Sequence, residues 1–217
     1  MIKNLGFGLI FNLLCSLITA QNSISIADYI INQSGDSLVF ENIARPELPL
    51  YYLQFQADSS SQQFWRIESD GQRRWESKDQ EGWKLYALSL TAQTYMLENP
   101  LLLYPAIFEK YKIYNSKTPY TTDETTGVLT LEVNAQGFET VQAPLRNFTD
   151  CLKIEIRMSF TEKNNPVLVI EIIEWYAKSI GLVKMIKNTY YKNSRTTIAG
   201  LLQKAQLSGK PLEGRKQ

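Results

Sequence analysis

Strict alternation of apolar and charged residues constrains this fold most, in a stretch that begins just after Cys151. Successive side chains of a β-strand point to opposite faces, so such a stretch has one buried and one solvated face. A helix would scatter the same charges around its circumference. The apolar set is Leu152, Ile154, Ile156 and Met158, and the charged set is Lys153, Glu155 and Arg157.

A second apolar run, Val167 to Tyr176, follows a polar connector that ends at Pro166. It is rich in β-branched and aromatic residues, and two such runs with a short connector predict an antiparallel hairpin. The run is long for a strand, so we expect a bulge or bend within it. Glu171 and Glu174 are an odd number of residues apart and should face opposite ways in an unbroken strand.

Shorter alternating segments fill most of the remaining chain, with residues 23–31 as a first strand or a short helix. Asp70-Gly71 between two of them favours a type I′ hairpin turn. A polar stretch at 134–137 predicts the turn of a third hairpin. The proline-fenced segment 99–108 is too broken for a regular helix. The expected strands are 35–41, 50–56, 64–69, 72–76, 83–91, 128–133, 138–142, 182–186 and 189–191, with a last apolar run at 198–207.

Short strands at near-regular spacing predict an all-β fold: a single strongly curved antiparallel sheet or a barrel-like domain with few short helices. We expect one domain over residues 21–207, followed by a flexible polar tail at 208–217. A chain of 217 residues buries roughly 70% of its unfolded surface, so it needs no disulfide to form a core.

Residues 1–20 are typical of a signal peptide. Lys3 precedes an apolar stretch from Leu5 to Ile18, and Ala20 ends a plausible cleavage site. A membrane anchor is the alternative, but the apolar stretch is shorter than the ~20 residues that a span needs. Leu14 precedes Cys15 where a lipoprotein signal has a small residue, so we expect cleavage rather than lipidation. The predicted location is periplasmic or extracellular, with envelope association left open.

Composition excludes several chemistries. The chain has no histidine and only two cysteines, which rules out catalytic triads with histidine, His-ligated zinc and a four-thiolate zinc site. We expect no metal and no cofactor. We also expect no enzyme activity, although carboxylate, Lys, Tyr or Ser-Lys chemistry remains possible for this composition. The formal net charge of +1 gives no electrostatic case for nucleic acid. After cleavage only Cys151 would remain, and we expect it to be a buried apolar residue rather than a reactive thiol.

Aromatic residues are the weak candidates for a binding site. Trp65, Trp75 and Trp83 lie on adjacent expected strands and could form a platform for a sugar or lipid, although cross-strand packing explains them as well. Trp175 and Tyr176 could line a pocket, although a core strand followed by a tight turn at Gly181 is the simpler interpretation. The arginines at 66, 73 and 74 could grip an anion, but a solvated hairpin edge is the simpler interpretation.

Two motifs resemble a known family. They are Phe138-Glu-Thr-Val-Gln-Ala-Pro-Leu-Arg-Asn-Phe-Thr-Asp-Cys-Leu-Lys-Ile154 and Glu174-Trp-Tyr-Ala-Lys-Ser-Ile-Gly-Leu-Val-Lys184. This part of the chain is similar to TapB-like exported bacterial domains of unknown function. The resemblance implies a curved antiparallel sheet outside the cytoplasm and brings no activity and no catalytic residues.

Three functional hypotheses remain open at this point. The first is an exported non-enzymatic protein that binds an apolar ligand, such as a lipid, or an envelope partner on the concave face of a curved sheet. The second is a structural or interaction module of a larger cell-envelope assembly. The third is a carboxylate-based glycan hydrolase, which requires two acidic side chains roughly 5–10 Å apart in a cleft.

Overall fold

The computed structural model describes residues 23–30, 33–57, 63–90 and 93–212 of the chain. Within these residues the protein is all-β, with one short 3₁₀ turn, η1 (Ile26–Asp28). The strands are β1 (Ser23–Ser25), β2 (Ser37–Asn42), β3 (Tyr51–Ala57), β4 (Gln63–Glu68), β5 (Arg73–Lys78), β6 (Gly82–Leu90), β7 (Gln93–Pro105), β8 (Ile107–Glu109), β9 (Ile113–Thr121), β10 (Thr126–Gln142), β11 (Asn147–Glu162), β12 (Asn165–Ala177), β13 (Gly181–Tyr191), β14 (Ser194–Leu207) and β15 (Lys210–Pro211).

Twelve of these strands close into an antiparallel barrel. Each strand pairs with the next in the chain except that β7 pairs with β9, because β8 leaves the barrel to pair with β1. β14 pairs with β13 on one side and with β2 on the other, which completes the ring. The β7–β9 contact is short, with Met96 opposite Thr121 and Leu97 opposite Tyr120, but it closes the ring. The predicted barrel-like sheet is therefore confirmed.

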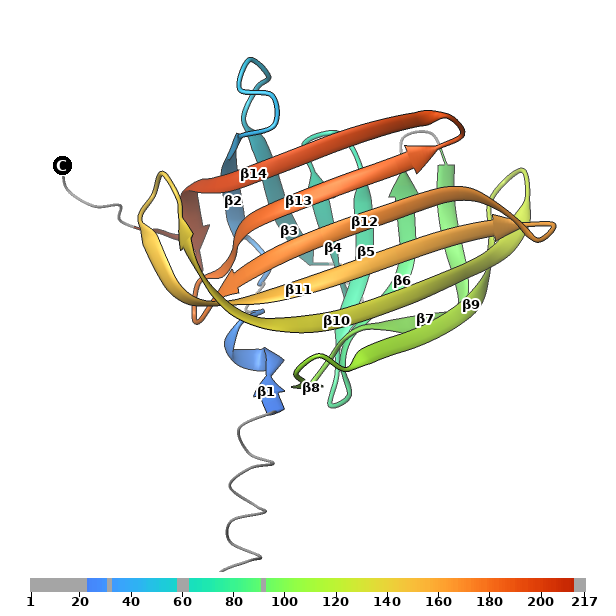
Figure 1. Cartoon of the computed structure of the whole chain (residues 1–217), viewed down its shortest axis with the longest axis horizontal. Helices are drawn as coiled ribbons and strands as arrows, with labels where there is room; N and C mark the ends of the chain where they lie inside the picture. Colours follow the sequence, from blue (N-terminus) through green and yellow to red (C-terminus); the bar gives the residue numbers. More distant parts are fainter. Residues whose placement is uncertain (1–22, 31–32, 58–62, 91–92, 213–217) are drawn as a thin grey trace, which may run out of the picture.

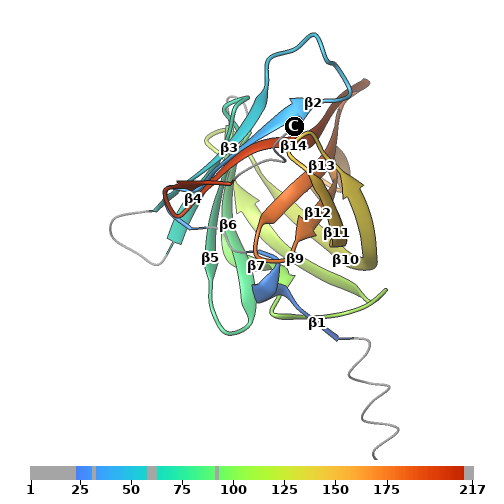
Figure 2. The ribbon, with the colours of Figure 1, turned by 90° about the vertical axis from the view of Figure 1, so that its left-hand side faces the viewer.

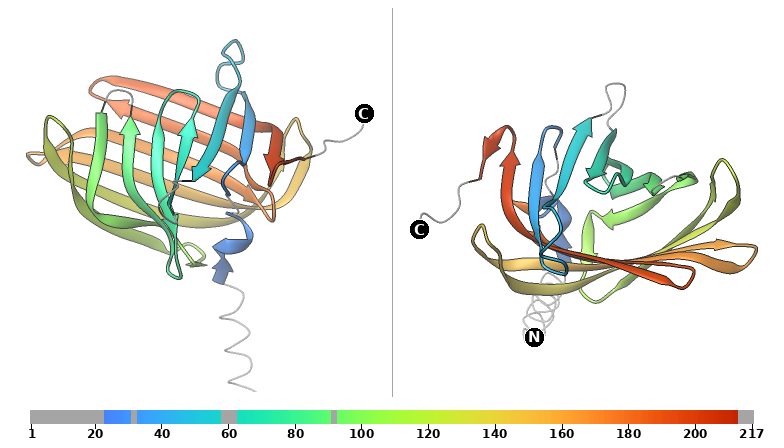
Figure 3. Two further views of the ribbon diagram at one scale, coloured as in Figure 1. Left: turned by 180° about the vertical axis from the view of Figure 1, so that it is seen from behind. Right: turned by 90° about the horizontal axis from the view of Figure 1, so that it is seen from above.

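The barrel is flattened into two layers (Figure 1). The long strands β9–β14 form a front layer, and β2–β7 form a back layer that runs across it at a steep angle. Viewed from the side and from above, the two layers face each other and curve together at their ends (Figures 2 and 3). Crossed layers of this kind bury the inner face of each sheet against the other.

The N-terminal segment covers one end of the barrel (Figure 1). Ile24, Ile26 and Ile30 are buried, and the Ile26 amide donates to the Ala106 carbonyl at 3.0 Å. The Ser179 amide donates to the Asp28 carbonyl at 2.8 Å, which ties the segment to the turn between β12 and β13. The alternative of a strand or a short helix at 23–31 therefore resolves into a three-residue strand and a single 3₁₀ turn.

The central hairpin is confirmed as β11 and β12, in register from Leu152↔Tyr176 to Phe160↔Leu168. Lys163 and Asn164 form its turn, both with positive φ (47° and 66°), which is the geometry of a two-residue type I′ connection. The expected irregularity in the second strand is a register shift between Trp175 and Tyr176.

The third predicted hairpin is wrong. Residues 126–142 form the single strand β10, and residues 134–137 are a bulge within it rather than a turn. Ala135 pairs with Ile154 and Gly137 with Lys153, so the residue between them is left out of the ladder. Gly137 takes φ +124° at this point. A glycine next to polar residues serves a bulge as well as a turn, and only the strands on both sides decide between them.

Two other turn and segment predictions need correction. The Glu68 amide donates to the Gln72 carbonyl at 2.8 Å, and Gly71 but not Asp70 has positive φ. The β4–β5 hairpin thus has a three-residue loop with a glycine bulge instead of a type I′ turn. The strand β7 runs through Pro100, which lies where the β6–β7 ladder is interrupted between Leu101 and Met96. A proline has no N–H to donate to a ladder, so it is tolerated at such an interruption.

At the C-terminus, pairing continues past Ser208, because Lys210–Pro211 returns to pair with Gln206 and Leu207. The predicted tail lies partly outside the described residues, from 213 onward, and the predicted signal peptide lies wholly outside them. Cys151 has 0% of its surface exposed, as expected for a structural cysteine.

Candidate functional site

Six charged side chains lie inside the barrel, each at most 5% exposed. Four come from the back layer, where an Arg-x-Glu pattern occurs in both strands of the β4–β5 hairpin. Residues two apart share a face, and Arg66 pairs with Arg74 in the ladder, so all four side chains point inward. The six are Arg66, Glu68, Arg74, Glu76, Glu174 and Lys187, three cations and three carboxylates, and we call them the internal charge cluster.

Glu174 of β12 reaches across the barrel to the back-layer arginines. One of its oxygens accepts from Arg66 Nη2 at 3.0 Å and lies 3.6 Å from Arg74 Nη2. The other accepts from the hydroxyls of Tyr104 at 2.6 Å and Tyr176 at 2.8 Å. Both oxygens of this fully buried carboxylate are therefore satisfied, as burial of a charge requires.

Lys187 of β13 makes a second link between the layers. Its ammonium donates to the Glu68 carboxylate and to Gln72 Oε1, the latter at 3.1 Å. Glu68 also accepts a hydrogen bond from the Tyr51 hydroxyl. Arg74 pairs with Glu76 at 3.1 Å. Each cation in the cluster thus has a carboxylate within ion-pair distance, and the two layers are joined by charges from both.

The cluster shifts the pKa values of its carboxyl groups. Burial by itself would raise the pKa of Glu68, but Lys187, Arg66 and other cations outweigh it and hold that pKa at about 2. The pKa of Glu174 is likewise lowered, because its arginine partners outweigh burial. Burial prevails at Glu76 and raises its pKa, although Arg74 acts in the opposite direction.

The interior beside the cluster leaves almost no free space. A cavity lined by Glu68, Arg74 and Lys187 measures about 10 Å³, enough for about one water molecule. The aromatic trio Tyr95, Tyr120 and Phe160 fills another part of the core, with ring centroids 4.8–5.6 Å apart. Around the internal charge cluster and around this aromatic trio, the inner face is therefore packed with the protein's own side chains.

A larger hollow lies on the outside of the front layer. This outer depression measures about 350 Å³ and runs over the strands β10, β11 and β12. Arg157 lies 3.4 Å from Glu171 there, and Gln136 donates to Glu155 at 2.9 Å. The depression is lined by Ile113, Glu132, Val133, Asn134, Glu155, Ile156, Arg157, Glu171, Ile172 and Ile173.

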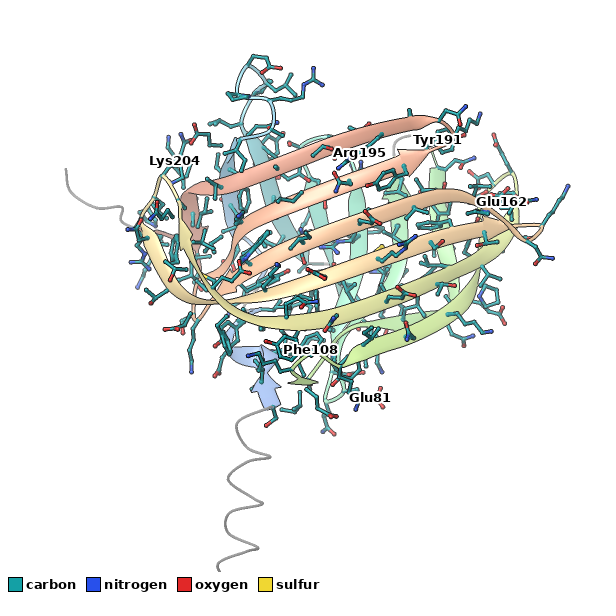
Figure 4. All side chains as sticks on the ribbon, in the orientation of Figure 1. Glu81, Phe108, Glu162, Tyr191, Arg195 and Lys204 are labelled. Carbon is teal, nitrogen blue, oxygen red and sulfur yellow. The ribbon has the colours of Figure 1, made fainter. Side chains whose placement is uncertain are left out.

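Figure 4 looks onto this outer face, with Glu162 at the tip of the β11–β12 hairpin and Tyr191 and Arg195 at the end of the β13–β14 hairpin. Alternation along β12 turns Glu171 outward onto this face while Glu174 points inward, as their odd spacing predicts. The two carboxylates of β12 therefore serve different surfaces and cannot act on one substrate.

The five aromatic candidates do not form one surface. Trp65 and Trp75 stack on the outside of the back layer, with ring centroids 5.7 Å apart and planes 10° apart. Trp83 is 2% exposed and packs inside, 5.0 Å from Phe64. A register shift in the β5–β6 ladder places Tyr86 next to Trp75 in its stead, so a three-tryptophan platform does not form.

The remaining two candidates are buried on opposite faces of β12. Trp175 is 4% exposed, donates its indole N–H to Glu139 at 2.8 Å and lies 4.1 Å from the Lys184 ammonium. Tyr176 is 1% exposed and belongs to the Glu174 contacts. Their packing matches the simpler interpretation, a core strand that ends in a tight turn at Gly181, where φ is +92°.

The sequence interpretation missed the internal charge cluster. It expected a solvated hairpin edge for the arginines, and this is wrong for Arg66 and Arg74, although Arg73 is exposed. The detectable pattern was the repeated Arg-x-Glu, which places opposite charges on one face of both hairpin strands. Trp65 and Trp75 occupy the other face of the hairpin. Tryptophan is buried far more often than arginine or glutamate, so the sequence favours that face as the inner one.

The described part of the chain contains no group of three or more acidic, Cys or His residues placed to hold a metal ion. It also contains no helix with the length and hydropathy that crossing a bilayer requires.

No protein-family model and no curated protein matches the chain. Among solved structures it is similar to the hypothetical lipoprotein YmcC of Escherichia coli, at 10% identity over 94% of this chain and 97% of that one, with a TM-score of 0.44. A Parabacteroides distasonis protein described as a lipoprotein aligns at 13% identity over 80% of this chain and 95% of that one, with a TM-score of 0.38.

A third structure, a Bacteroides fragilis protein described as exported and with a YmcC-like fold, aligns at 14% identity over 82% of this chain and 99% of that one, with a TM-score of 0.34. These neighbours are described as lipoproteins or as exported, and the descriptions name no activity. Likenesses this remote carry no argument about what this chain does, and its resemblance to TapB-like domains stays a prediction.

Proposed function

We propose that this protein is an exported, non-enzymatic interaction module that presents the outer face of its front layer to a partner in a cell-envelope assembly. One observation carries the proposal. The pocket beside the internal charge cluster measures about 10 Å³, whereas the outer depression measures about 350 Å³. Small-molecule sites commonly measure about 300–1,000 Å³, so the outside offers the space that the inside lacks.

The filled interior argues against an apolar ligand on the concave face. An apolar guest there would have to displace paired charges, which costs several kcal/mol for each ion left without its partner. Native mass spectrometry of the protein purified from its own envelope tests this point. We expect the mass of the processed chain alone under several extraction conditions, and a reproducible lipid adduct would contradict it.

Glycan hydrolysis has little support for a related reason. A glycosidase needs one carboxyl group to protonate the leaving oxygen and a second to act as base or nucleophile, both open to the sugar. Glu68, Glu76 and Glu174 are at most 5% exposed and are held by arginine or lysine. A carboxylate fixed in an ion pair out of reach of solvent is a structural group. Glu155 and Glu171 in the outer depression are open to solvent, but each is paired with a cation, Lys153 at 3.7 Å and Arg157 at 3.4 Å.

Site-specific photo-crosslinking in the native envelope tests the interaction itself. Ser159 of β11 shares the outer face with Arg157, and Gln54 of β3 is an exposed position on the back layer. We expect a crosslinker at Ser159 to give an adduct of one defined mass that excess unlabelled protein competes away, and a crosslinker at Gln54 to give none. Equal or absent adducts at both positions would contradict the proposal.

A further inference from the structure

The strand β14 forms the upper rim of the front layer (Figure 1), and its first residues pair on one side only. Residues 194–201 pair with β13, whereas β2 joins the other side of β14 only from Gly200 onward. Among the residues that the structure describes, 194–198 therefore have a free ladder edge, which we call the β14 edge. An edge of this kind is a ready template for another strand.

The pattern of backbone hydrogen bonds shows which groups the β14 edge offers. In an antiparallel ladder, the N–H and C=O of one residue face one neighbouring strand, and those of the next residue face the opposite way. The Ala199 carbonyl faces away from β13, because it accepts from the Ile43 amide at 2.8 Å. The N–H and C=O groups of Thr197 and Arg195, two and four residues earlier, therefore also face away from β13.

The side chains next to these groups leave the β14 edge open. Arg195 Nη2 and Thr197 Oγ1 both donate to Asn188 Oδ1 of β13, at 3.0 Å and 2.8 Å. The Arg195 guanidinium also lies 5.5 Å from the Tyr190 ring, so both side chains lean toward β13. Edge strands are commonly protected by a charge, a proline or a bulge. Residues 194–198 contain no proline, form a regular ladder with β13 and direct their one charge away from the edge.

The β14 edge is complementary to itself. An antiparallel pair of two such edges, centred on Thr196, places Arg195 of each copy opposite Thr197 of the other. Each copy then uses both of its outward N–H groups and both of its outward C=O groups, which makes four bonds between the copies. Centring the pair on Arg195 or on Thr197 would form only two of them, because the hairpin turn and Ile43 block the other positions.

Exposed apolar side chains lie at each end of the β14 edge. Ile43, which contacts Ala199, is 41% exposed and begins a loop in which Leu48 and Leu50 are 41% and 44% exposed. At the other end, Tyr191 precedes the β13–β14 turn and is 50% exposed. Antiparallel pairing sets the turn of one copy beside the loop of the other, and two-fold symmetry repeats this contact at both ends.

From these observations we propose that two copies of this protein pair through the β14 edge and join their front layers into one continuous sheet. The inference goes beyond the proposed function, because it uses β14, whereas the outer depression lies over β10, β11 and β12. Four main-chain bonds with a small apolar area form a contact at the weak end of specific interfaces, with a dissociation constant on the order of 10 µM.

Sedimentation velocity of the processed chain, over roughly 1–100 µM, tests the pairing. We expect a monomer–dimer equilibrium. The variant Thr197→Pro removes one outward N–H from each copy, and thus two of the four bonds, but no N–H of the β13–β14 ladder. It should fold and should dimerise at least about tenfold more weakly. Thr197→Ala keeps the N–H and should dimerise as the wild type does. Circular dichroism and thermal unfolding check that both variants are folded.

Cysteine cross-linking tests the register. Thr196 lies opposite itself in a non-hydrogen-bonded pair, where Cα atoms are about 4.5 Å apart, within the range that a disulfide spans. We expect Thr196→Cys to form a disulfide-linked dimer on mild oxidation. Lys204→Cys, at an exposed position where β14 already pairs with β2, should not. The native Cys151 is buried and does not compete.

A monomer at every concentration, an unchanged dimer in the folded Thr197→Pro variant, or equal cross-linking of the two cysteine variants would overturn the inference. A photo-crosslinker at Thr196 in the native envelope identifies the occupant. An adduct with the mass of two chains supports the inference, and an adduct of any other mass contradicts it. These results do not depend on the crosslinker at Ser159, so failure of this inference and failure of the proposed function are distinguishable.

Discussion

The two layers of the barrel line its interior with different kinds of side chain. The front layer lines the interior almost entirely with apolar residues, such as Leu131, Ile156 and Met158, and contributes only Glu174 and Lys187 as charges. The β4–β5 hairpin of the back layer places four charged side chains at the same depth. Apolar burial is non-directional and works against any apolar surface, whereas each buried charge needs a partner at a particular place.

This difference gives the two layers different roles in specificity. The front layer can stabilise the barrel through burial alone. The charges of the back layer form two ion pairs of their own, Arg66–Glu68 at 3.8 Å and Arg74–Glu76 at 3.1 Å. Glu174 and Lys187 come from the other layer and add a second partner to Arg66 and to Glu68. We therefore expect the internal charge cluster to specify how the layers face each other, and to add little net stability over an apolar core of the same volume.

The largest effect should follow removal of Glu174. The substitution Glu174→Ala leaves Arg66 and Arg74 buried without their shared carboxylate, and should lower the free energy of unfolding by about 3–5 kcal/mol. Denaturant unfolding measures it. Glu171→Ala, on the outer face of the same strand, is the matched control and should change the free energy by less than about 0.5 kcal/mol. Equal losses would remove the distinction between the two faces.

A double substitution sharpens the same comparison. Arg66→Met with Glu174→Leu removes one cation and one carboxylate together, and leaves Arg74 paired with Glu76 and Lys187 paired with Glu68. The hydroxyls of Tyr104 and Tyr176 lose Glu174 but keep their hydrogen bond to each other at 3.1 Å. We expect it to regain most of the stability lost in Glu174→Ala, because an ion pair replaced by apolar groups is often neutral or stabilising. A double variant as unstable as the single one would show that the cluster contributes net stability.

Acid should lower the free energy of unfolding through the buried carboxylate Glu68. The pKa of Glu68 lies at about 2 in the folded protein, below its ordinary value of 4.5, so the unfolded state binds its proton first as the pH falls. Its contribution, on the order of 3 kcal/mol, is complete above pH 4.5 and is lost as the pH falls toward 2. Glu68→Gln should flatten the fall in unfolding free energy between pH 5 and about pH 2. Parallel curves for the variant and the wild type would contradict this.

A smaller loss of unfolding free energy is expected for a substitution in the apolar core of the front layer. Ile156→Val removes one methyl group from the front-layer core and should cost about 0.5–1.5 kcal/mol with no dependence on pH. Denaturant unfolding at pH 7 and pH 4 measures both quantities. A pH-dependent loss would mean that the front-layer core and the internal charge cluster are energetically coupled.

The smallest effect concerns Cys151. Burial raises the pKa of its thiol to about 11, and no part of its surface is exposed, so a thiol reagent should label it only after unfolding. Ser159→Cys, on the outer face of the same strand, provides the reactive control. Rapid labelling of Cys151 in the native protein would show that the front layer opens locally.

Local patterns predicted the strands well and the turns poorly. The alternation from Leu152 to Met158 identified β11, its pairing with β12 and the opposite directions of Glu171 and Glu174. The polar stretch that ends at Gly137 looked like a turn but is a bulge, because turns and bulges use the same residue types. The outer depression could not be predicted, since it depends on which side chains three neighbouring strands bring together.

Period-two patterning by itself determined that this chain forms strands with two distinct faces, and that a closed or strongly curved sheet must bury one of them. Only the tertiary structure decided which face of the β4–β5 hairpin is inside. Trp65 and Trp75 are the more apolar choice, yet Arg66 and Arg74 are buried. The physical reason is that a charge can be buried when its partner is at hand, and Glu174, 108 residues away from Arg66 in the chain, becomes a neighbour only when the barrel closes.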